Sequence, residues 1–490
     1  MEKSQLVVIP SPDISHLTST IEFSNLLINH HHRLSITILI IAAPPDATAV
    51  SFLNSISSSI RQRLQIILLP SDHSDNSSHY QKRKSIFLES TVQLTKPRVR
   101  DAVSNLTSAP GSPRLAGFIV DMFSTAMIDV ADEFGVPSMV FYTSSAASLG
   151  VLLHVHTLRE RDAFDTTTSS GGGDLATEIF ADPVPLSVVP SFAVEEDWKT
   201  FFWNYGRGLK RAKGIIVNSF EEFESHAIRA VSDSGIHVYP VGPILGLKAD
   251  SDSDKSDVIE WLDNQPPSSV IFLCFGSRGR FDEEQVREMA YAIEKSGVRF
   301  LWSLRKPPPK EGNNNDSAEF EFEDILPKGF LERTAGIGRV IGWAPQTKIL
   351  AHKATGGFVS HCGWNSVLES LYFGVPIATW PLYAEQQMNA FQLVRELKMA
   401  VEICLDYNMV YNSGGNFVSA EKIEKGIRDV MREENEIREK VKKMSEICGK
   451  ALTESGSSHH HLGRLIHDIT KMEAHYGVFV FGAEFMLNIG

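Results

Sequence analysis

Leu6-Val-Val-Ile9 and Ser35-Ile-Thr-Ile-Leu-Ile-Ile41 are two short apolar runs of the kind that form buried strands. Between them, the apolar side chains of residues 19–29 follow a roughly helical spacing. A strand, a helix and a second strand make a βαβ unit, whose strands pair in parallel through a right-handed crossover. The chain therefore begins with the repeating unit of a doubly wound α/β sheet.

The same alternation continues and then starts a second time, which predicts two similar α/β domains. The further strands are expected at 65–69, 115–120, 138–142, 214–217 and 238–247, and then at 270–275, 300–304, 338–341, 357–360 and 376–380. Residues 248–257, Lys-Ala-Asp-Ser-Asp-Ser-Asp-Lys-Ser-Asp, have the composition of a linker. Although 490 residues allow three domains, we expect two, at 1–247 and 258–455.

Composition and charge limit the classes of partner. Acidic residues outnumber basic ones by 60 to 47, and a formal net charge of −13 argues against binding nucleic acid by broad electrostatic attraction. The four cysteines show no CxxC pair and no zinc-like spacing, as in intracellular proteins with reduced thiols. The first residues lack a signal-peptide pattern, and residues 38–45 are too short to span a membrane, which takes about 20 residues. We expect a cytoplasmic protein.

The turn after the expected strand 357–360 has features of an anion-binding site. The expected strand 357–360 runs directly into a helix expected at 365–373. The turn presents His361, Asn365 and Ser366 beside the free N–H groups of a helix N-terminus, which favours a phosphate or a pyrophosphate. An ordinary strand-to-helix turn with a capping Asn or Ser explains the same residues, so both interpretations stay open at this point.

A second candidate site joins His16 to Asp121. His16 opens the first helix, whose partially positive N-terminus keeps an imidazole neutral, as a general base must be. Asp121 ends the strand 115–120, at the edge where open α/β sheets bind ligands, and a carboxylate there would stabilise an imidazolium. A capping histidine and an unrelated loop aspartate fit the same spacing.

The segment from Trp343 to Gln386 resembles the 44-residue signature of the plant family 1 UDP-glycosyltransferases, which are small-molecule glycosyltransferases of GT-B fold. It begins Trp-Ala-Pro-Gln, contains His-Cys-Gly-Trp-Asn-Ser at 361–366, and ends Glu-Gln. The resemblance extends to about Lys471 and is greatest for the branch that glucosylates flavonoids, other phenolics and terpenoids. It implies an α/β protein with two Rossmann-like domains that face each other across a cleft. A helix at 456–475 would cross back to the first domain, before an apolar tail at 476–490.

The resemblance implies UDP-glucose as the donor and assigns its contacts. The implied donor-binding residues are Trp343, Ala344 and Gln346 at the uracil, Glu369 at the ribose, Ser277, His361, Asn365 and Ser366 at the diphosphate, and Thr143, Trp364, Glu385 and Gln386 at the sugar. In this family a glutamine at the last signature position accompanies glucose, whereas a histidine there accompanies galactose. Gln386 therefore favours glucose.

The catalytic His–Asp pair of the family falls on His16 and Asp121. The resemblance implies that His16 deprotonates an acceptor hydroxyl while Asp121 balances the imidazolium, in an inverting transfer without a metal or another cofactor. The acceptor pocket is expected near Phe87, Met122, Phe123, Tyr142 and Phe192. The partners are a UDP-sugar and a small lipophilic acceptor, and the enzyme is expected to be a monomer. The Asp252-Ser-Asp254 triplet sits in the linker and is interpreted as solvated chain.

Residues 10–16, Pro-Ser-Pro-Asp-Ile-Ser-His, depart from the family pattern, which has glycines before the histidine. Glycine allows close backbone approach, and Asp13 and Ser15 reduce that freedom. Asp13 also adds a negative charge near the expected diphosphate, which Arg278 and Arg280 would partly offset. Two alternatives to transfer therefore stay open: a nucleotide-sugar epimerase or hydrolase, and a UDP-sugar-binding protein that lost its activity with the loop glycines.

Overall fold

The computed structural model describes residues 3–11, 13–41, 63–69, 84–108, 110–164, 173–246, 257–307, 321–409 and 417–476. The side chains of 14–15, 84–91 and 471–476 lie outside this description. The expected linker, apart from Asp257, and the apolar tail beyond Tyr476 also fall outside it, as does the Asp252-Ser-Asp254 triplet.

The first sheet has seven parallel strands in the order β3-β2-β1-β4-β5-β8-β9. Its strands are β1 (Ser4–Ile9), β2 (Leu34–Ile41), β3 (Leu64–Leu69), β4 (Arg114–Asp121), β5 (Ser138–Tyr142), β8 (Gly214–Val217) and β9 (Val238–Pro240). Around it lie α1 (Ile14–His30), α4 (Lys84–Ser108), η2 (Thr125–Met127), α5 (Ile128–Glu133), α6 (Ala146–Glu160), α7 (Ser191–Val194), η5 (Glu196–Trp198), α8 (Lys199–Arg211) and α9 (Ser225–Asp233). The strands are nearly continuous apolar runs because helices cover parallel sheets on both faces.

The second sheet has six parallel strands in the order β12-β11-β10-β13-β14-β15. Its strands are β10 (Val270–Cys274), β11 (Arg299–Ser303), β12 (Gly338–Ile341), β13 (Thr355–Ser360), β14 (Ile377–Thr379) and β15 (Ala400–Glu402). Its helices are α10 (Asp257–Asp263), α11 (Glu283–Ser296), η6 (Phe322–Asp324), α12 (Phe330–Thr334), α13 (Gln346–Ala351), α14 (Trp364–Tyr372), α15 (Gln386–Phe391), η7 (Gln392–Glu396), α16 (Ala420–Met431) and α17 (Glu436–Ala451). In both sheets the first strand of the unit is central and the order reverses beside it, as in Rossmann folds. The expected α/β class with two doubly wound parallel sheets is confirmed.

The chain divides into two compact units, and the division does not follow the sequence in order. The first unit comprises 1–164, 192–249 and 450–490, and the second comprises 165–191 and 250–449. In the second unit, the hairpin of β6 (Asp174–Leu175) and β7 (Val184–Pro185) is followed by η4 (Leu186–Val188), which packs against α15. Phe180 stacks edge-on against Phe391 there, with ring centroids 5.5 Å apart. Residues 173–191 thus belong to the second unit, although they were expected in the first domain.

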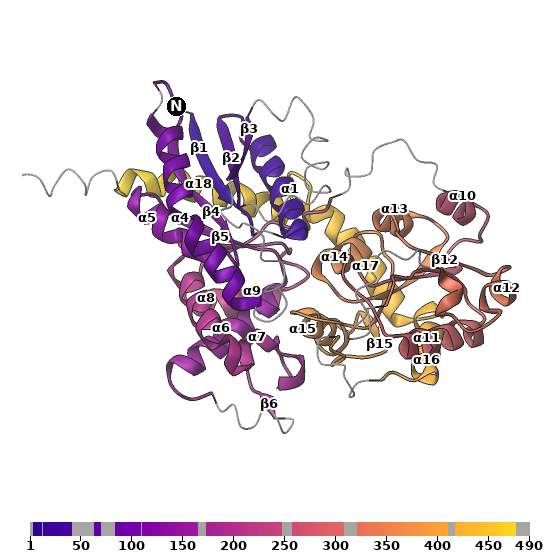
Figure 1. The fold of residues 1–490 in the computed structure, drawn as a ribbon. Helices are drawn as coiled ribbons and strands as arrows, with labels where there is room; N and C mark the ends of the chain where they lie inside the picture. The colour runs from indigo at the N-terminus through magenta and orange to yellow at the C-terminus, as the bar shows by residue number, and fades with distance from the viewer. Residues whose placement is uncertain are drawn as a thin grey trace, which may run out of the picture. The chain divides into compact units, whose positions relative to one another are not determined.

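The last helix, α18 (Ser457–Tyr476), packs on the first unit against β9, β4 and α1 (Figure 1). Leu465 is fully buried in the core of that sheet, and the Tyr239 hydroxyl donates to the Asp468 carboxylate at 2.8 Å. Arg464 also donates to the carbonyl of Val238. Within the described residues, no helix combines the length and apolarity that crossing a membrane requires.

Two boundaries differ from the sequence prediction. The strand expected at 238–247 is only three residues long and ends at Pro240. The amphipathic pattern of residues 423–444 predicts a single surface helix, but the structure has two, α16 and α17, separated at 432–435. Asn435 closes the break, because its side-chain oxygen accepts the N–H of Ile437 and its amide donates to the carbonyl of Asp429. Side-chain capping of this kind competes with helix continuation.

Candidate active site

The first candidate site lies where the strand order of the first sheet reverses. β1 and β4 are neighbours in the sheet, and β2 lies on the other side of β1. His16 follows β1 at the start of α1, and Asp121 is the last residue of β4. The carboxyl edge of a doubly wound sheet binds ligands at this switch point, because the loops there diverge and leave a crevice. The fold thus brings together two residues 105 positions apart.

The geometry of the His16–Asp121 pair determines which ring nitrogen donates to the carboxylate and which is left as the base. His16 Nδ1 lies 2.7 Å from Asp121 Oδ2, and the backbone N–H of Phe123 donates to Oδ1 of the same carboxylate at 2.9 Å. The Asp121 side chain is fully buried, whereas 17% of the His16 side chain is exposed. An N–H on Nδ1 donating to the carboxylate leaves Nε2 as the basic nitrogen. This is the arrangement of a general base with an orienting acid.

Two further predicted residues, Thr143 and Phe123, lie beside the His16 ring, and two more pack against them. The Thr143 hydroxyl lies 3.2 Å from His16 Nδ1 and 3.8 Å from the sulfur of Met122. The ring of Phe123 lies 5.5 Å from the imidazole, centroid to centroid. Phe192 packs edge-on against Phe123 at 6.4 Å. Met122, Phe123 and Phe192, predicted for the acceptor pocket, therefore lie at or beside the base.

The other two predicted pocket residues are Tyr142 and Phe87. Tyr142 is fully buried, and its hydroxyl is already 2.9 Å from Ser148 Oγ. The side chain of Phe87, on α4, lies outside the described residues. Asp13 takes the position before α1, where its carbonyl accepts the N–H of Leu17. Aspartate is among the residues preferred at a helix N-cap, which gives a local reason for its presence there.

A second candidate site has the same placement in the second sheet. β10 and β13 are neighbours at the switch point. Ser277 follows β10 and is exposed in the turn with Arg278 and Arg280, while His361 follows β13 and leads into α14. The first turn of α14 carries Asn365 and Ser366. The N-terminus of this helix therefore lies at the ligand-binding edge, as an anion site requires.

His361 is held as a neutral ring. Burial lowers the pKa of His361 to about 4. Within the described residues its Nδ1 has no hydrogen-bond partner. A Cβ built on Gly363 or Gly276 would come within 2.5 or 2.6 Å of His361 Nε2, so only glycine at these positions leaves room for the ring. Gly276 also has a φ of +72°, which glycine adopts without strain. His361 can thus offer an anion a neutral N–H rather than a positive charge.

The predicted uracil and ribose residues form one surface. The Gln346 amide nitrogen donates to Ser366 Oγ and to Glu369 Oε2, both at 2.8 Å. Trp343 is 68% exposed, an unusual state for a tryptophan and one that suits a stacking partner. Ala344 joins Trp343 to the start of α13. Gln346 therefore connects the predicted ribose residue, Glu369, to the predicted diphosphate residue, Ser366, by hydrogen bonds.

The side-chain oxygen of Gln386 holds the side chain in one orientation. Its Oε1 accepts the backbone N–H groups of Leu382 at 3.0 Å and Tyr383 at 3.1 Å, and the residue is buried. The amide nitrogen is then the group left to donate to a ligand. Ala384, in the same turn, has a φ of +59°, and Cys362, beside His361, has a φ of +60°. Non-glycine residues held in this region store about 1–3 kcal/mol each, and they cluster at functional sites. Glu385 is the residue immediately before α15.

The cysteines and the charged clusters carry no further chemistry of this kind. All four cysteines are buried, and burial raises the pKa of Cys274, Cys362 and Cys404. Among the described residues, no three histidine, cysteine, aspartate or glutamate side chains gather closely enough to bind a metal ion.

Comparison with known proteins identifies the family. Residues 228–447 match the model of the UDP-glucoronosyl and UDP-glucosyl transferase family. A UDP-glucose flavonoid 3-O-glucosyltransferase of Fragaria ananassa is 47% identical, over 95% of this chain and 98% of its own length. The chain belongs to the plant family 1 UDP-glycosyltransferases.

Solved structures of the family have the same fold. The Medicago truncatula glycosyltransferase UGT71G1, complexed with UDP-glucose, superposes with a TM-score of 0.85 at 38% identity, covering 96% of this chain and 98% of that one. Phytolacca americana UGT2, complexed with UDP-2-fluoro-glucose and pterostilbene, gives a TM-score of 0.82 at 30% identity, with 95% and 100% covered. The GT-B fold and the glycosyltransferase class that the signature predicted are therefore confirmed.

The sequence did not predict that aromatic residues of α8 lie beside Phe123. Phe201 and Tyr205 of α8 pack against Phe123, with centroid separations of 6.2 and 5.9 Å. The aromatic run Phe-Phe-Trp at 201–203 was the available signal, but nothing in its spacing shows that α8 would lie beside the loop after β4. Only the packing of distant elements brings it there.

Proposed function

We propose that this glycosyltransferase transfers glucose from UDP-glucose to a hydroxyl of a small lipophilic plant metabolite, a flavonoid, another phenolic or a terpenoid, with inversion at the anomeric carbon. His16 is the general base and Asp121 is its partner. The observation that carries the proposal is the 2.7 Å contact between His16 Nδ1 and the buried Asp121 carboxylate at the switch point of the first sheet.

The bond changes follow from this pair. His16 Nε2 takes the proton of the acceptor hydroxyl, and the acceptor oxygen forms a bond to C1 of the glucose. The bond from C1 to the UDP oxygen breaks on the opposite face, so one displacement inverts the configuration. Asp121 stabilises the imidazolium that forms. UDP leaves as an anion, and the product is a neutral glucoside.

The donor side stabilises the charge that develops on the leaving diphosphate. The N-terminus of α14, with Asn365 and Ser366, supplies N–H and hydroxyl donors, and Ser277 is exposed at the neighbouring turn. His361 adds a neutral donor because its pKa is lowered by burial. Preorganised dipoles of this kind act without a metal ion. Gln386 would present its amide nitrogen to a glucose hydroxyl.

The acceptor class rests on the relatives and on the aromatic side chains near the base. The strawberry relative is named as a flavonoid 3-O-glucosyltransferase, and the Phytolacca structure contains pterostilbene. Phe123 and Phe192 supply aromatic surface beside His16. Aromatic surface of this kind suits a ring-bearing, lipophilic hydroxyl compound.

The direct test is incubation of the purified enzyme with UDP-glucose and a panel of flavonoids, stilbenes and terpenoid alcohols, followed by mass spectrometry. We expect at least one acceptor to gain one hexose and UDP to be released in equal amount. Release of free glucose or conversion of the UDP-sugar without an acceptor product would favour a hydrolase or an epimerase instead.

The second candidate is a UDP-sugar-binding protein whose transfer is weak because Asp13 and Ser15 replace loop glycines. Asp13 would raise the donor KM through its charge, and Arg278 and Arg280 would partly compensate. The test is Asp13→Gly, which should cost only a few tenths of a kcal/mol as a cap replacement. A lower donor KM in this variant would support the proposed effect of the Asp13 charge. An unchanged donor KM would contradict it. Tight UDP-glucose binding without turnover on any acceptor would favour the binding protein.

A further inference from the structure

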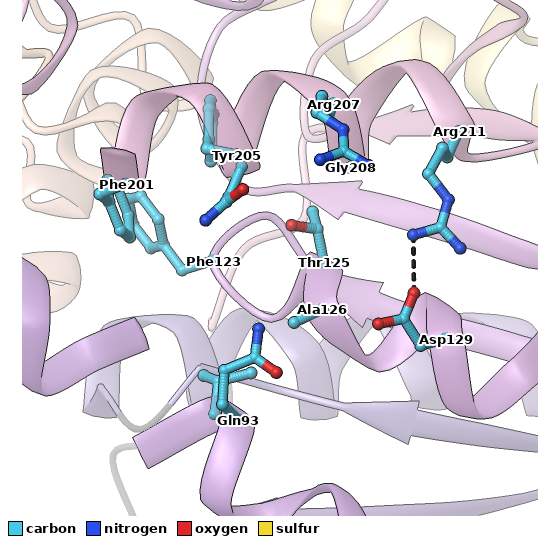
Figure 2. A pocket seen from close by; sticks show the side chains of 12 residues that line it. Gln93, Phe123, Thr125, Ala126, Asp129, Phe201, Tyr205, Arg207, Gly208 and Arg211 are labelled. Atoms are coloured by element: carbon cyan, nitrogen blue, oxygen red, sulfur yellow. Dashed lines mark hydrogen bonds and ion pairs between the residues drawn. The ribbon is translucent and has the colours of Figure 1, made fainter. Parts of the chain in front are cut away.

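A pocket of about 190 Å³ lies in the first unit, between α4, η2 and α8. Figure 2 shows its lining, which includes Phe123, Phe201 and Tyr205. These rings form its apolar wall. A cavity of about 150 Å³ in another protein holds a benzene molecule, so this pocket has room for one substituted aromatic ring.

Phe123 belongs to both the pocket and the catalytic site. Its ring lines the pocket and also lies 5.5 Å from the ring of His16. A molecule that presents a hydroxyl to His16 and extends past Phe123 would therefore place its far end in the pocket. This inference rests on the proposed function, because it concerns the distal part of the acceptor.

Close packing of α8 on η2 forms one end of the pocket. A Cβ built on Gly208 would lie 2.4 Å from the Cβ and from the Oγ1 of Thr125, so the helix can approach η2 this closely only with glycine there. Arg207 and Arg211 flank Gly208 on the same helix and also line the pocket. The pocket thus has aromatic rings at one end and guanidinium groups at the other.

The two arginines are in different states. Arg211 donates to Asp129 at 2.7 Å and to Asp132 at 2.7 Å, and Lys96 donates to the other oxygen of Asp129 at 2.6 Å. The acidic groups at this end are therefore already paired with basic ones. Arg207 has no hydrogen bond or ion pair with any residue that the structure describes, and its charge is uncompensated.

Two neutral polar groups in the pocket are also available. Gln93 and Thr125 line it, and neither side chain has a hydrogen-bond partner in the described part of the chain. An amide, a hydroxyl and a guanidinium beside aromatic rings suit an aromatic ring that bears oxygen substituents. The unpaired guanidinium of Arg207 favours a ring whose oxygen substituent is negatively charged.

We propose that this pocket binds the distal ring of a two-ring acceptor and that Arg207 selects acceptors whose distal ring carries a carboxylate. The ring lies against Phe123, Phe201 and Tyr205, and the carboxylate pairs with the guanidinium. Arg207 is then a specificity-determining residue that takes no part in the bond changes at C1.

The test compares two acceptors of the same shape, 4′-hydroxystilbene-4-carboxylate and its 4-carboxamide, with UDP-glucose. In the wild-type enzyme we expect the carboxylate to have the lower KM by roughly threefold to tenfold, since Arg207 is partly screened by solvent. Arg207→Gln should bring the ratio of the two KM values close to one. A wild-type ratio of one, or a ratio that Arg207→Gln leaves unchanged, overturns the proposal.

Lys210→Gln is the matched control, because it removes the same charge from α8. Lys210 pairs with Glu160 and Thr157 and does not line the pocket. It should keep the wild-type KM ratio, and an equal loss in both variants would mean that only the long-range charge matters, which contradicts the proposal. Ala126→Leu, which adds volume at the pocket wall, should raise the KM of both stilbenes and leave that of the one-ring acceptor 4-methylphenol unchanged.

A binding measurement separates this proposal from the proposed reaction. Stilbene-4-carboxylate lacks the hydroxyl and cannot be glucosylated, so its Kd is measured by isothermal titration calorimetry on the intact enzyme. We expect Arg207→Gln to weaken its binding by roughly threefold to tenfold. An unchanged Kd overturns the pocket assignment. If binding depends on Arg207 but no acceptor is ever glucosylated, the proposed function fails and the pocket assignment stands.

Discussion

At the scale of the residue, Asp121 uses its two oxygens for two different purposes. Oδ1 accepts the N–H of Phe123, and Oδ2 faces His16 Nδ1. In Asp121→Asn, the backbone N–H would keep the amide oxygen in place and turn the NH2 group toward the ring. Nδ1 would then have to accept a hydrogen bond, which moves the ring proton to Nε2 and blocks the base.

We therefore expect Asp121→Asn to lower kcat by about 10²–10⁴-fold, the usual contribution of general-base catalysis. The substitution is nearly isosteric, so the thermal unfolding midpoint should change little. Steady-state kinetics with a good acceptor and a thermal melt of the same preparation are the measurements. A folded variant that keeps more than a tenth of the wild-type kcat would contradict the assigned tautomer.

Gln386 offers a similarly narrow substitution. Gln386→Glu keeps an oxygen to accept the N–H groups of Leu382 and Tyr383 but loses the amide N–H that we assign to the sugar. The fold should persist, and the KM for UDP-glucose should rise by about 2–10-fold, the effect of one hydrogen bond. UDP lacks the sugar, so its inhibition constant is the control and should stay the same. If Gln386→Glu and the wild-type enzyme had the same KM for UDP-glucose, the assigned contact between Gln386 and the sugar would be wrong.

At the scale of the element, α18 shows what a helix pattern tells and what it leaves open. Leu462, Leu465, Ile466 and Ile469 recur at helical spacing and are all buried. Such a pattern predicts a helix with one buried face. It does not say which sheet covers that face, because the periodicity contains no information about a partner. The packing on β9 and β4 comes from the structure.

We expect Leu465→Ala to lower the free energy of unfolding by about 2–5 kcal/mol, because a fully buried leucine leaves a cavity. His467→Ala lies two positions away on the exposed side of α18 and should change it by less than about 0.5 kcal/mol. Urea denaturation followed by circular dichroism measures both. Equal effects of the two substitutions would mean that α18 does not contribute to the core.

The strands were more predictable than the short elements. The apolar runs at 138–142, 214–217 and 338–341 coincide with β5, β8 and β12. β15, Ala-Val-Glu at 400–402, was not predicted, because three residues that end in a glutamate carry too little periodicity. Asp282 and Gln285 have the spacing of a capping box. Asp282 does cap α11, but the Gln285 amide pairs with the backbone of Val418 instead of reaching back to the cap. Such long-range pairing is absent from any local pattern.

The candidate site was predictable to different depths. Spacing alone left the His361 turn and the His16–Asp121 pair undecided between functional and structural interpretations. The family resemblance favours the functional interpretation of both, because it covers positions that no periodicity links. The pocket beside Phe123 could not be predicted, since it depends on the contact between Gly208 and Thr125, which lie in separate elements.

At the scale of the whole molecule, buried and partly buried histidines make the fold sensitive to acid. Burial is the largest cause that lowers the pKa of His30, His31, His156, His361 and His461. The unfolded chain therefore binds more protons than the folded one below the ordinary histidine pKa of about 6.5. Stability is fully present above that pH and falls as the pH drops from about 6.5 toward the lowered folded values.

We expect the urea midpoint to fall between pH 7.5 and pH 5, and His361→Asn to reduce this pH dependence, since His361 has a pKa of about 4 in the folded state. His467→Asn, at an exposed position of α18, is the control and should keep the wild-type dependence. If His361→Asn leaves the difference between the two pH values unchanged, the ring is not held neutral by burial.

The net charge of −13 also bears on how an anionic donor can bind. An anionic donor has to bind against the overall field, so we infer that its affinity comes from local groups, namely the N-terminus of α14 and the neutral His361. The charge argues against a nucleic-acid partner, and it is compatible with a small anionic substrate that is bound by preorganised dipoles.

The central claim is that His16 activates the acceptor hydroxyl, and the kcat of His16→Ala tests it most directly. The measurement uses saturating UDP-glucose and an acceptor that the wild-type enzyme glucosylates, with UDP-glucose binding checked on the same preparation. We expect kcat to fall by about 10²–10⁴-fold while the donor Kd stays close to the wild-type value. A loss of less than tenfold in kcat, with the donor still bound, would contradict the assignment of His16 as the base.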